Sequence, residues 1–188
     1  RTSRRLVEQI DALTKIATEF SSFAKMPDAV NEYVSIGELV ESVHQLFARE
    51  AVHMEFVLNR HYPPPDSPQN LYVYADRDQL LRVLNNLYKN AIQAIPEDRI
   101  GRIQTDVVIA GREWVKIAVA DNGTGILPEQ QKKVFVPNFT TKSSGTGLGL
   151  AMSKNIVEMA KGQIYFETKA EEGTVFFIEL PLSSPEAG

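Results

Sequence analysis

The segment TKSSGTGLGLAM, from Thr141 to Met152, places three glycines at alternate positions immediately before an apolar, helix-like run. Glycine permits positive φ and a close approach of the backbone to another group, and a helix N-terminus favours an anion. A P-loop would end in Gly-Lys-Ser/Thr, and a G-x-G-x-x-G motif counted from Gly145 needs a glycine where Leu150 stands. Both familiar nucleotide fingerprints are therefore excluded, and the pattern indicates a phosphate held near a helix start.

Composition indicates one globular domain with an additional element. The 188 residues are 43% apolar and 23% charged, without an apolar run long enough to cross a bilayer. There is no cysteine, which excludes disulfides and thiolate metal sites. The net charge of −4 does not favour nucleic-acid binding, so any polyanion would have to be bound at a local site. The chain begins without Met or a signal peptide, and we expect a fragment of a longer protein.

The first 27 residues predict one long helix that ends at Met26-Pro27. It could fold against its own domain, or it could be one helix of a bundle whose partners are missing. The narrow stripe and the polar remaining faces favour the bundle. The apolar stripe consists of Leu6, Ile10, Leu13, Ala17, Phe20 and Ala24.

From Asn31 onward the pattern is mixed α/β. We expect strands over residues 32–35, 53–59, 71–75, 103–110, 114–120, 163–168 and 174–180. Helices are expected over about 36–47, 78–95, 128–134 and 147–162, with Ser35 and Asp76 as N-caps. Two hairpins disfavour a parallel doubly wound sheet, so we predict an α+β fold with a mixed sheet covered by helices on one face.

The helix over 78–95 carries two polar amides, Asn86 and Asn90, one turn apart and away from its buried stripe. An amide oxygen can ligate Mg²⁺ while phosphates and water complete the shell. The alternative is an ordinary solvated polar face. The expected stripe is Leu80, Leu84, Leu87, Ala91 and Ile95, and the polar face also holds Arg82 and Gln93.

The segment AVADNGTGI, residues 118–126, ends a strand at Asp121 and then turns through Gly123 and Gly125. A plain turn in which Asp121 bonds its own backbone is the simpler interpretation. A calcium loop of the EF-hand type is disfavoured because Lys132 stands where its twelfth-position glutamate belongs.

Four segments in order resemble the N, G1, F and G2 boxes of sensor histidine kinases, which are members of the GHKL ATPase superfamily. They are NNLYKNAIQAI (85–95), DNGTGI (121–126), FVPNFTTK (135–142) and GTGLGL (145–150). The wording of NFTTK and MSKNIVE resembles the nitrogen-regulatory type, and EFSSFAKMP resembles the second helix of a dimerisation and phosphotransfer domain. The resemblance implies a two-layer α/β sandwich of the Bergerat type.

The resemblance also implies a role for each segment. Asn90 would ligate Mg²⁺, Asp121 would accept from the adenine amino group, and Thr174 would hold the adenine site through water. Phe135 and Phe139 would anchor the start of a mobile ATP lid, residues 140–146. The implied ATP-binding residues are Asn86, Lys89, Asn90, Asp121, Gly123, Gly125, Ile126, Thr140, Thr141, Lys142, Gly145, Thr146, Gly147, Leu148 and Thr174.

By the same resemblance, residues 1–27 form part of the dimerisation domain, residues 31–182 form the ATP-binding domain, and 183–188 form a flexible tail. The phospho-accepting histidine is absent, because His44, His53 and His61 lie in the ATP-binding domain. We therefore expect ATP and Mg²⁺ binding without autophosphorylation. Expected partners are the missing histidine-bearing helix, a response regulator and a second copy in the full-length protein. The expected location is the cytoplasm, including the cytoplasmic part of an inner-membrane sensor.

Transfer of phosphate is favoured over hydrolysis, because hydrolytic GHKL enzymes carry a glutamate base where Asn86 stands. Two alternatives remain: a GHKL serine kinase of the anti-sigma type, and a pseudokinase that only binds nucleotide or a partner protein.

Overall fold

A mixed five-stranded sheet forms one layer of the structure, a computed structural model that describes residues 2–24, 28–62, 71–137 and 147–184. Its strands lie in the order β2-β4-β5-β7-β6. They are β2 (Glu55–His61), β4 (Arg102–Ala110), β5 (Trp114–Asp121), β6 (Gln163–Lys169) and β7 (Gly173–Pro181). Strand β2 runs parallel to β4, and the other neighbours are antiparallel, which confirms the predicted mixed sheet.

Two hairpins form most of this sheet. Strands β4 and β5 meet at a turn where Gly111 has a φ of 69°, and β6 and β7 pair from Gln163↔Glu179 to Lys169↔Gly173. A separate antiparallel pair consists of β1 (Glu32–Ser35) and β3 (Tyr72–Ala75). Both hairpins were predicted from the apolar runs on either side of turn residues.

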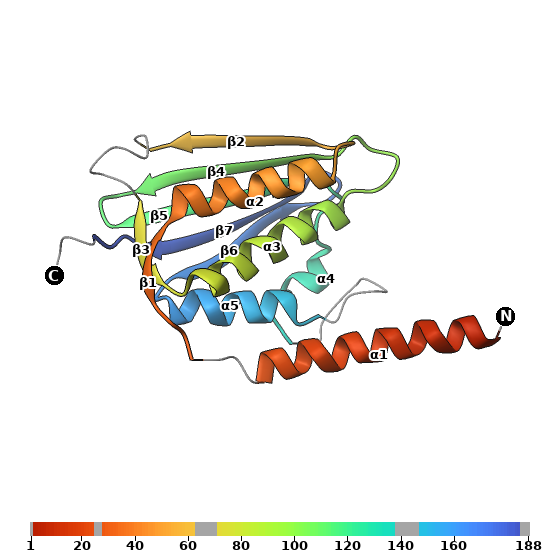
Figure 1. Cartoon of the computed structure of the whole chain (residues 1–188). Helices are drawn as coiled ribbons and strands as arrows, with labels where there is room; N and C mark the ends of the chain where they lie inside the picture. Colours follow the sequence, from red (N-terminus) through yellow and green to blue (C-terminus); the bar gives the residue numbers. More distant parts are fainter. Residues whose placement is uncertain (1, 25–27, 63–70, 138–146, 185–188) are drawn as a thin grey trace.

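Helices α2 (Ile36–Glu50), α3 (Arg77–Ala94) and α5 (Gly149–Met159) cover one face of the sheet, and a short α4 (Pro128–Gln131) precedes α5 (Figure 1). The predicted caps are confirmed. The Ser35 hydroxyl accepts from the Glu38 amide at 3.5 Å, and Asp76 Oδ1 accepts from the Gln79 amide at 3.0 Å. Asp76 Oδ2 also accepts from the Val30 amide at 2.9 Å, so one carboxylate caps α3 and holds the preceding connection.

The core lies between the helices and the sheet. Side chains alternate along β4, where Ile103, Thr105 and Val107 are buried against the helices. The predicted apolar stripe is buried at all five positions from Leu80 to Ile95. The first four lie in α3 and confirm its helical spacing, whereas Ile95 follows the helix as its C-cap.

Tyr88 is the largest fully buried side chain, and its hydroxyl lies 2.6 Å from that of Thr105. Its ring stacks on Phe47 at 5.2 Å and on Phe56 at 6.5 Å between centroids. Burial raises the pKa of Tyr88 to about 12, and the Thr105 hydrogen bond opposes part of that rise. The tyrosine fixes α3, which carries the two amides, on the sheet.

Helix α1 (Thr2–Ala24) runs outside the two layers (Figure 1). Leu6, Ile10, Leu13 and Phe20 expose 52, 56, 65 and 54% of their surface, so the predicted apolar stripe of this helix is not buried against the two layers in this structure. Among the described helices, none combines the length and apolar character that a membrane crossing needs.

Several expected boundaries require correction. Strand β2 begins at Glu55 rather than residue 53, because residues 52–54 form a turn closed by the Met54 amide on the Ala51 carbonyl. Helix α4 stops at Gln131, three residues early, and α5 covers 149–159 rather than 147–162. The C-terminal end of α5 is closed by the Gly162 amide on the Val157 carbonyl.

Candidate functional site

Asp121 is the last residue of β5, a central strand, and it is largely buried. Its Oδ1 accepts from the Gly123 amide at 2.8 Å and from the Thr174 amide at 3.3 Å. The simpler interpretation of this turn, in which Asp121 bonds its own backbone, is therefore part of the observed geometry. The second donor belongs to β7, so the carboxylate also joins two strands.

Thr174 and Thr168 connect the loop after β5 to the β6-β7 hairpin. The Thr168 hydroxyl accepts from the Ile126 amide at 2.9 Å and donates to the Gly173 carbonyl at 3.1 Å. It lies 2.9 Å from the Thr174 hydroxyl, which is buried. Either hydroxyl can be the donor of this pair, and a hydroxyl oxygen also has two lone pairs that can accept.

The two glycines after Asp121 meet protein rather than open space. A Cβ at Gly123 would lie 2.5 Å from the carbonyl oxygen of Ala94, at the end of α3, and Gly125 has a φ of 75°. The Thr124 amide donates to the same Ala94 carbonyl at 3.1 Å. The family resemblance predicts that these glycines let the chain pass close to a nucleotide base. The contact with the Ala94 carbonyl already requires glycine at position 123, without any bound base.

Asn86 joins α3 to the first turn of α5. Its amide nitrogen donates to the Ser153 hydroxyl at 3.1 Å, and that hydroxyl donates to the Gly149 carbonyl at 2.8 Å. A Cβ at Gly149 would lie 2.2 Å from Asn86 Oδ1, so only glycine permits this approach. Asn86 therefore links the N-box helix to the first turns of the G2-box helix.

Asn90 lies one turn beyond Asn86 and is half-buried, and Lys89 beside it is exposed. Their spacing places both amides on the same face of α3. Among the described residues, no group of three or more His, Cys, Asp or Glu side chains could hold a metal ion. A hard cation at Asn90 would thus need oxygen ligands from a bound phosphate and from water.

The N-terminus of α5 follows Gly147, whose φ of 70° lies in the left-handed region. Leu148 is fully buried, and no side chain of the described residues caps the helix there. The first amides of an α-helix lack intrahelical partners and carry a partial positive charge. The remaining predicted lid residues, Thr140, Thr141, Lys142, Gly145 and Thr146, lie outside the described residues, as does Phe139.

Phe135 packs in an aromatic cluster at the start of the predicted lid. Its ring lies 6.0 Å from that of Phe166 and 6.4 Å from that of Phe176, and the Lys154 ammonium lies 5.8 Å above it. The cluster fixes the chain where the F box begins.

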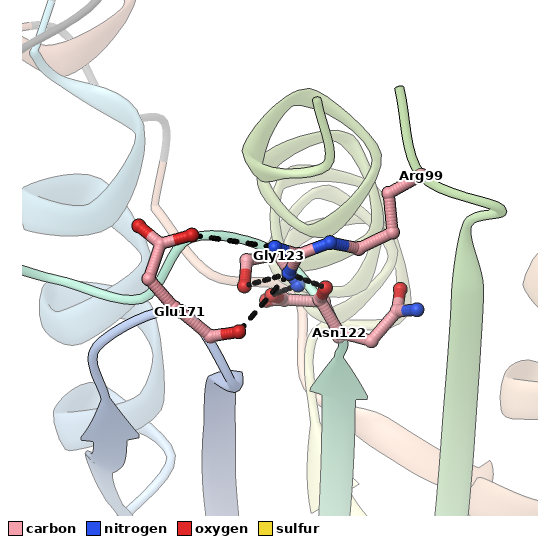
Figure 2. Close-up of polar contacts among 5 residues, drawn as sticks. Arg99, Asn122, Gly123 and Glu171 are labelled. Atoms are coloured by element: carbon pink, nitrogen blue, oxygen red, sulfur yellow. Dashed lines mark hydrogen bonds and ion pairs between the residues drawn. The ribbon is translucent and has the colours of Figure 1, made fainter. Parts of the chain in front are cut away.

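Sequence reasoning missed Arg99, which lies between α3 and β4 and binds the loop after Asp121. Figure 2 shows its guanidinium among the backbone oxygens of Asn122 and Gly123 and both the backbone and side chain of Glu171. Nothing in the local sequence signals this role, because an isolated arginine in an irregular segment is usually a solvated surface residue.

The three histidines lie away from this region. His44 is half-buried in α2, with Nδ1 3.4 Å from the Tyr88 hydroxyl, while His53 and His61 are exposed. Burial, and then the charge of Arg60, lower the pKa of His44, and Glu41 opposes this shift.

Residues 75–184 match the family described as "Histidine kinase-, DNA gyrase B-, and HSP90-like ATPase". The sensor histidine kinase ZraS of Salmonella typhimurium is 34% identical over 177 residues, which cover 94% of this chain. These residues are 37% of ZraS, so the chain spans little more than a third of that relative.

Solved structures of histidine kinases resemble the chain. The catalytic domain of histidine kinase ThkA is 33% identical with a TM-score of 0.68, and the match covers 81% of this chain and 95% of that domain. Histidine kinase ThkA in complex with the response regulator protein TrrA is 28% identical with a TM-score of 0.74, and the match covers 97% and 50% of the two chains. The second match extends over nearly the whole chain.

Proposed function

The chain belongs to the family of histidine kinase-, DNA gyrase B-, and HSP90-like ATPases, and we therefore propose that it binds ATP and transfers the γ-phosphate to a histidine of a sensor histidine kinase. The phospho-accepting histidine lies on a dimerisation helix outside these 188 residues. The chain supplies the nucleotide site, and the helix supplies the nucleophile.

One observation carries the proposal. Asn86 of α3 bonds the first turns of α5, whose N-terminus no side chain of the described residues caps, while Asp121 ends the strand beside the C-terminal end of α3. An elongated ligand can therefore place an amino-bearing base at the Asp121 carboxylate and its anionic tail at the α5 amides. The Thr174 hydroxyl, on the residue that pairs with Asp121 across β5 and β7, supports a bridging water on the base side. The implied lid, residues 140–146, would cover the phosphates.

Mg²⁺ fits the residues present at the phosphate end. Asn90 offers a neutral oxygen ligand on the same face as Asn86, and Lys89 adds a nearby positive charge. When bound, the ion neutralises charge on the phosphates. Asn90 would hold it, Asn86 would orient the α5 amides, and the described residues supply no carboxylate cluster that would compete.

The amide side chain of Asn86 fits phosphoryl transfer better than ATP hydrolysis. An amide cannot take a proton from water, and the amide nitrogen of Asn86 already donates to Ser153. Phosphoryl transfer to a histidine needs positioning and charge neutralisation, because the acceptor is itself a nucleophile. We therefore expect slow ATP hydrolysis by this chain.

The wider setting is also proposed from resemblance. The exposed apolar stripe of α1 supports a helical dimerisation domain in residues 1–27, with the ATP-binding domain in 31–182 and a tail in 183–188. The ThkA relative was solved with a response regulator, which supports such a partner here. The wording of NFTTK and MSKNIVE supports the nitrogen-regulatory type, and a cytoplasmic location follows from this role.

The metal assignment is tested by titrating ATP into the wild type, Asn90→Ala and Gln93→Ala, with and without Mg²⁺. Gln93→Ala is the control, since it removes an exposed amide from the same helix. We expect Asn90→Ala alone to lose the Mg²⁺-dependent part of the affinity. Equal Mg²⁺ dependence in the two variants would refute the role of Asn90.

The transfer step is tested in a chimera in which the dimerisation domain of a related sensor kinase precedes Asp28. With γ-labelled ATP we expect an acid-labile, base-stable phosphate on its histidine. Acid-stable label would indicate a serine kinase instead. Binding of ATP without any label would identify a nucleotide-binding module.

A further inference from the structure

The side chain of Arg99 joins two segments that are distant in the sequence. Its Nη1 donates to the carbonyl oxygens of Asn122 at 2.7 Å, Gly123 at 2.9 Å and Glu171 at 3.2 Å. Its Nη2 donates to Glu171 Oε2 at 3.3 Å. Asn122 and Gly123 follow β5, whereas Glu171 lies in the turn between β6 and β7, and Figure 2 shows the guanidinium between them.

The same two segments supply the hydrogen bonds that hold Asp121. The Gly123 amide and the Thr174 amide both donate to Asp121 Oδ1. Arg99 binds the carbonyl of Gly123 itself and the turn that leads into Thr174. A displacement of either segment would therefore rotate or release the Asp121 carboxylate.

Arginine suits this position because its planar, charged fork can meet several oxygens at once, which a lysine ammonium cannot do in the same geometry. The Arg99 side chain is 29% exposed, so its bonds to the carbonyls are partly shielded from water. The Glu171 side chain is 76% exposed, and such an ion pair contributes little. The carbonyl contacts therefore carry most of the effect.

The loop has further connections that preserve the fold without Arg99. The Glu171 amide donates to the Thr124 carbonyl at 2.8 Å, and the Asn122 side chain bonds the backbone of Ile100 and Arg102 at 2.9 and 2.8 Å. We expect removal of the guanidinium to loosen the loop rather than unfold the domain.

We propose that Arg99 is a positioning residue for base selection: it holds the Asp121 carboxylate in the orientation that accepts the adenine amino group. Guanine presents a carbonyl at the corresponding edge, which a fixed carboxylate repels. A carboxylate that is no longer held in place would bind the adenine amino group less tightly and repel the guanine carbonyl less strongly. This inference rests on the proposed function, because it assigns the base of ATP to Asp121.

The test compares ATP and GTP, each with Mg²⁺, by calorimetric titration of the wild type, Arg99→Gln, Arg99→Lys and Arg102→Gln. Arg102 is the matched control: its guanidinium pairs with Glu55 at 3.8 Å, and its loss removes the same unit of charge. For Arg99→Gln we expect ATP affinity to fall about tenfold, as for a lost set of charge-assisted hydrogen bonds. GTP affinity should not fall, Arg99→Lys should be intermediate, and Arg102→Gln should keep the wild-type ratio.

The outcomes separate this inference from the proposed function. A wild type that does not bind ATP contradicts the proposed function. A wild type that prefers ATP, with the same preference in Arg99→Gln, overturns only the role of Arg99. A merely structural role would lower ATP and GTP affinities together, and melting curves would then show a smaller folded fraction. Should Arg99→Gln not fold, an unchanged ratio in Arg99→Lys overturns the inference.

Discussion

The contact between Gly149 and Asn86 makes a sharp prediction about stability. In Gly149→Ala the new Cβ would lie 2.2 Å from Asn86 Oδ1 and 2.9 Å from its Cγ, so the amide must move and its hydrogen bond to Ser153 is lost. Overpacking of this kind costs about 1–3 kcal/mol, and the helix propensity of alanine returns up to ~1 kcal/mol. We therefore expect Gly149→Ala to lower the free energy of unfolding by about 1–2 kcal/mol.

A second pair of variants, made in an Asn86→Ala background, removes the side chain with which the new Cβ would clash. In an Asn86→Ala background the clash disappears, and Gly149→Ala should then be neutral or stabilising by up to ~1 kcal/mol. Urea unfolding followed by circular dichroism gives each value, and the double-mutant cycle should show a coupling of about 1–3 kcal/mol. An identical cost of Gly149→Ala in both backgrounds would refute the packing argument, and with it the link between the two helices.

Two further predictions concern the buried network behind α3. Tyr88→Phe should lower the free energy of unfolding, measured in urea, by about 1–3 kcal/mol, because it leaves the fully buried Thr105 hydroxyl without its partner at 2.6 Å. Adding Thr105→Val to this variant removes the unpaired hydroxyl and should restore most of the lost stability. For His44, the lowered folded-state pKa means that the unfolded chain binds the proton first, so stability is lost as the pH falls below the ordinary value of 6.5. Unfolding measured from about pH 8 to pH 5 should show this loss in wild type and in a His53→Gln control but not in His44→Phe, and equal slopes in all three would contradict it.

The sequence predicted most of the architecture because its local signals agree with one another. The apolar spacing of α3 is buried as expected, and Ser35 and Asp76 cap their helices through the predicted amides. Period-two strands and turn glycines gave both hairpins. Where local signals were weak the boundaries were wrong, as at β2 and α4. One turn bond redirects the chain before β2, and consecutive turn bonds between residues three apart replace the helix after Gln131.

The candidate site could be predicted only in part. Residues within a sequence motif can be recognised from their neighbours in the chain, whereas residues whose partners are distant in the sequence cannot. Asp121, Asn86 and Asn90 follow from the boxes. The structure places Asp121 at the end of β5 and both asparagines in α3, with Asn86 bonded to Ser153 of α5. Arg99 and Thr168 could not be found, because their partners lie on segments that only the folded sheet brings together. A single sequence does not reveal such long-range hydrogen bonds.

The proposed nucleotide site depends most directly on the base-binding role of Asp121. Asp121→Asn keeps an oxygen that can accept from the Gly123 and Thr174 amides, but it replaces the second carboxylate oxygen with an amide donor. Calorimetric titration should show that the wild type binds Mg²⁺-ATP and that Asp121→Asn binds it about 10–100-fold more weakly, with the melting temperature little changed. Equal ATP affinity in the two proteins would contradict the assignment of the base to Asp121.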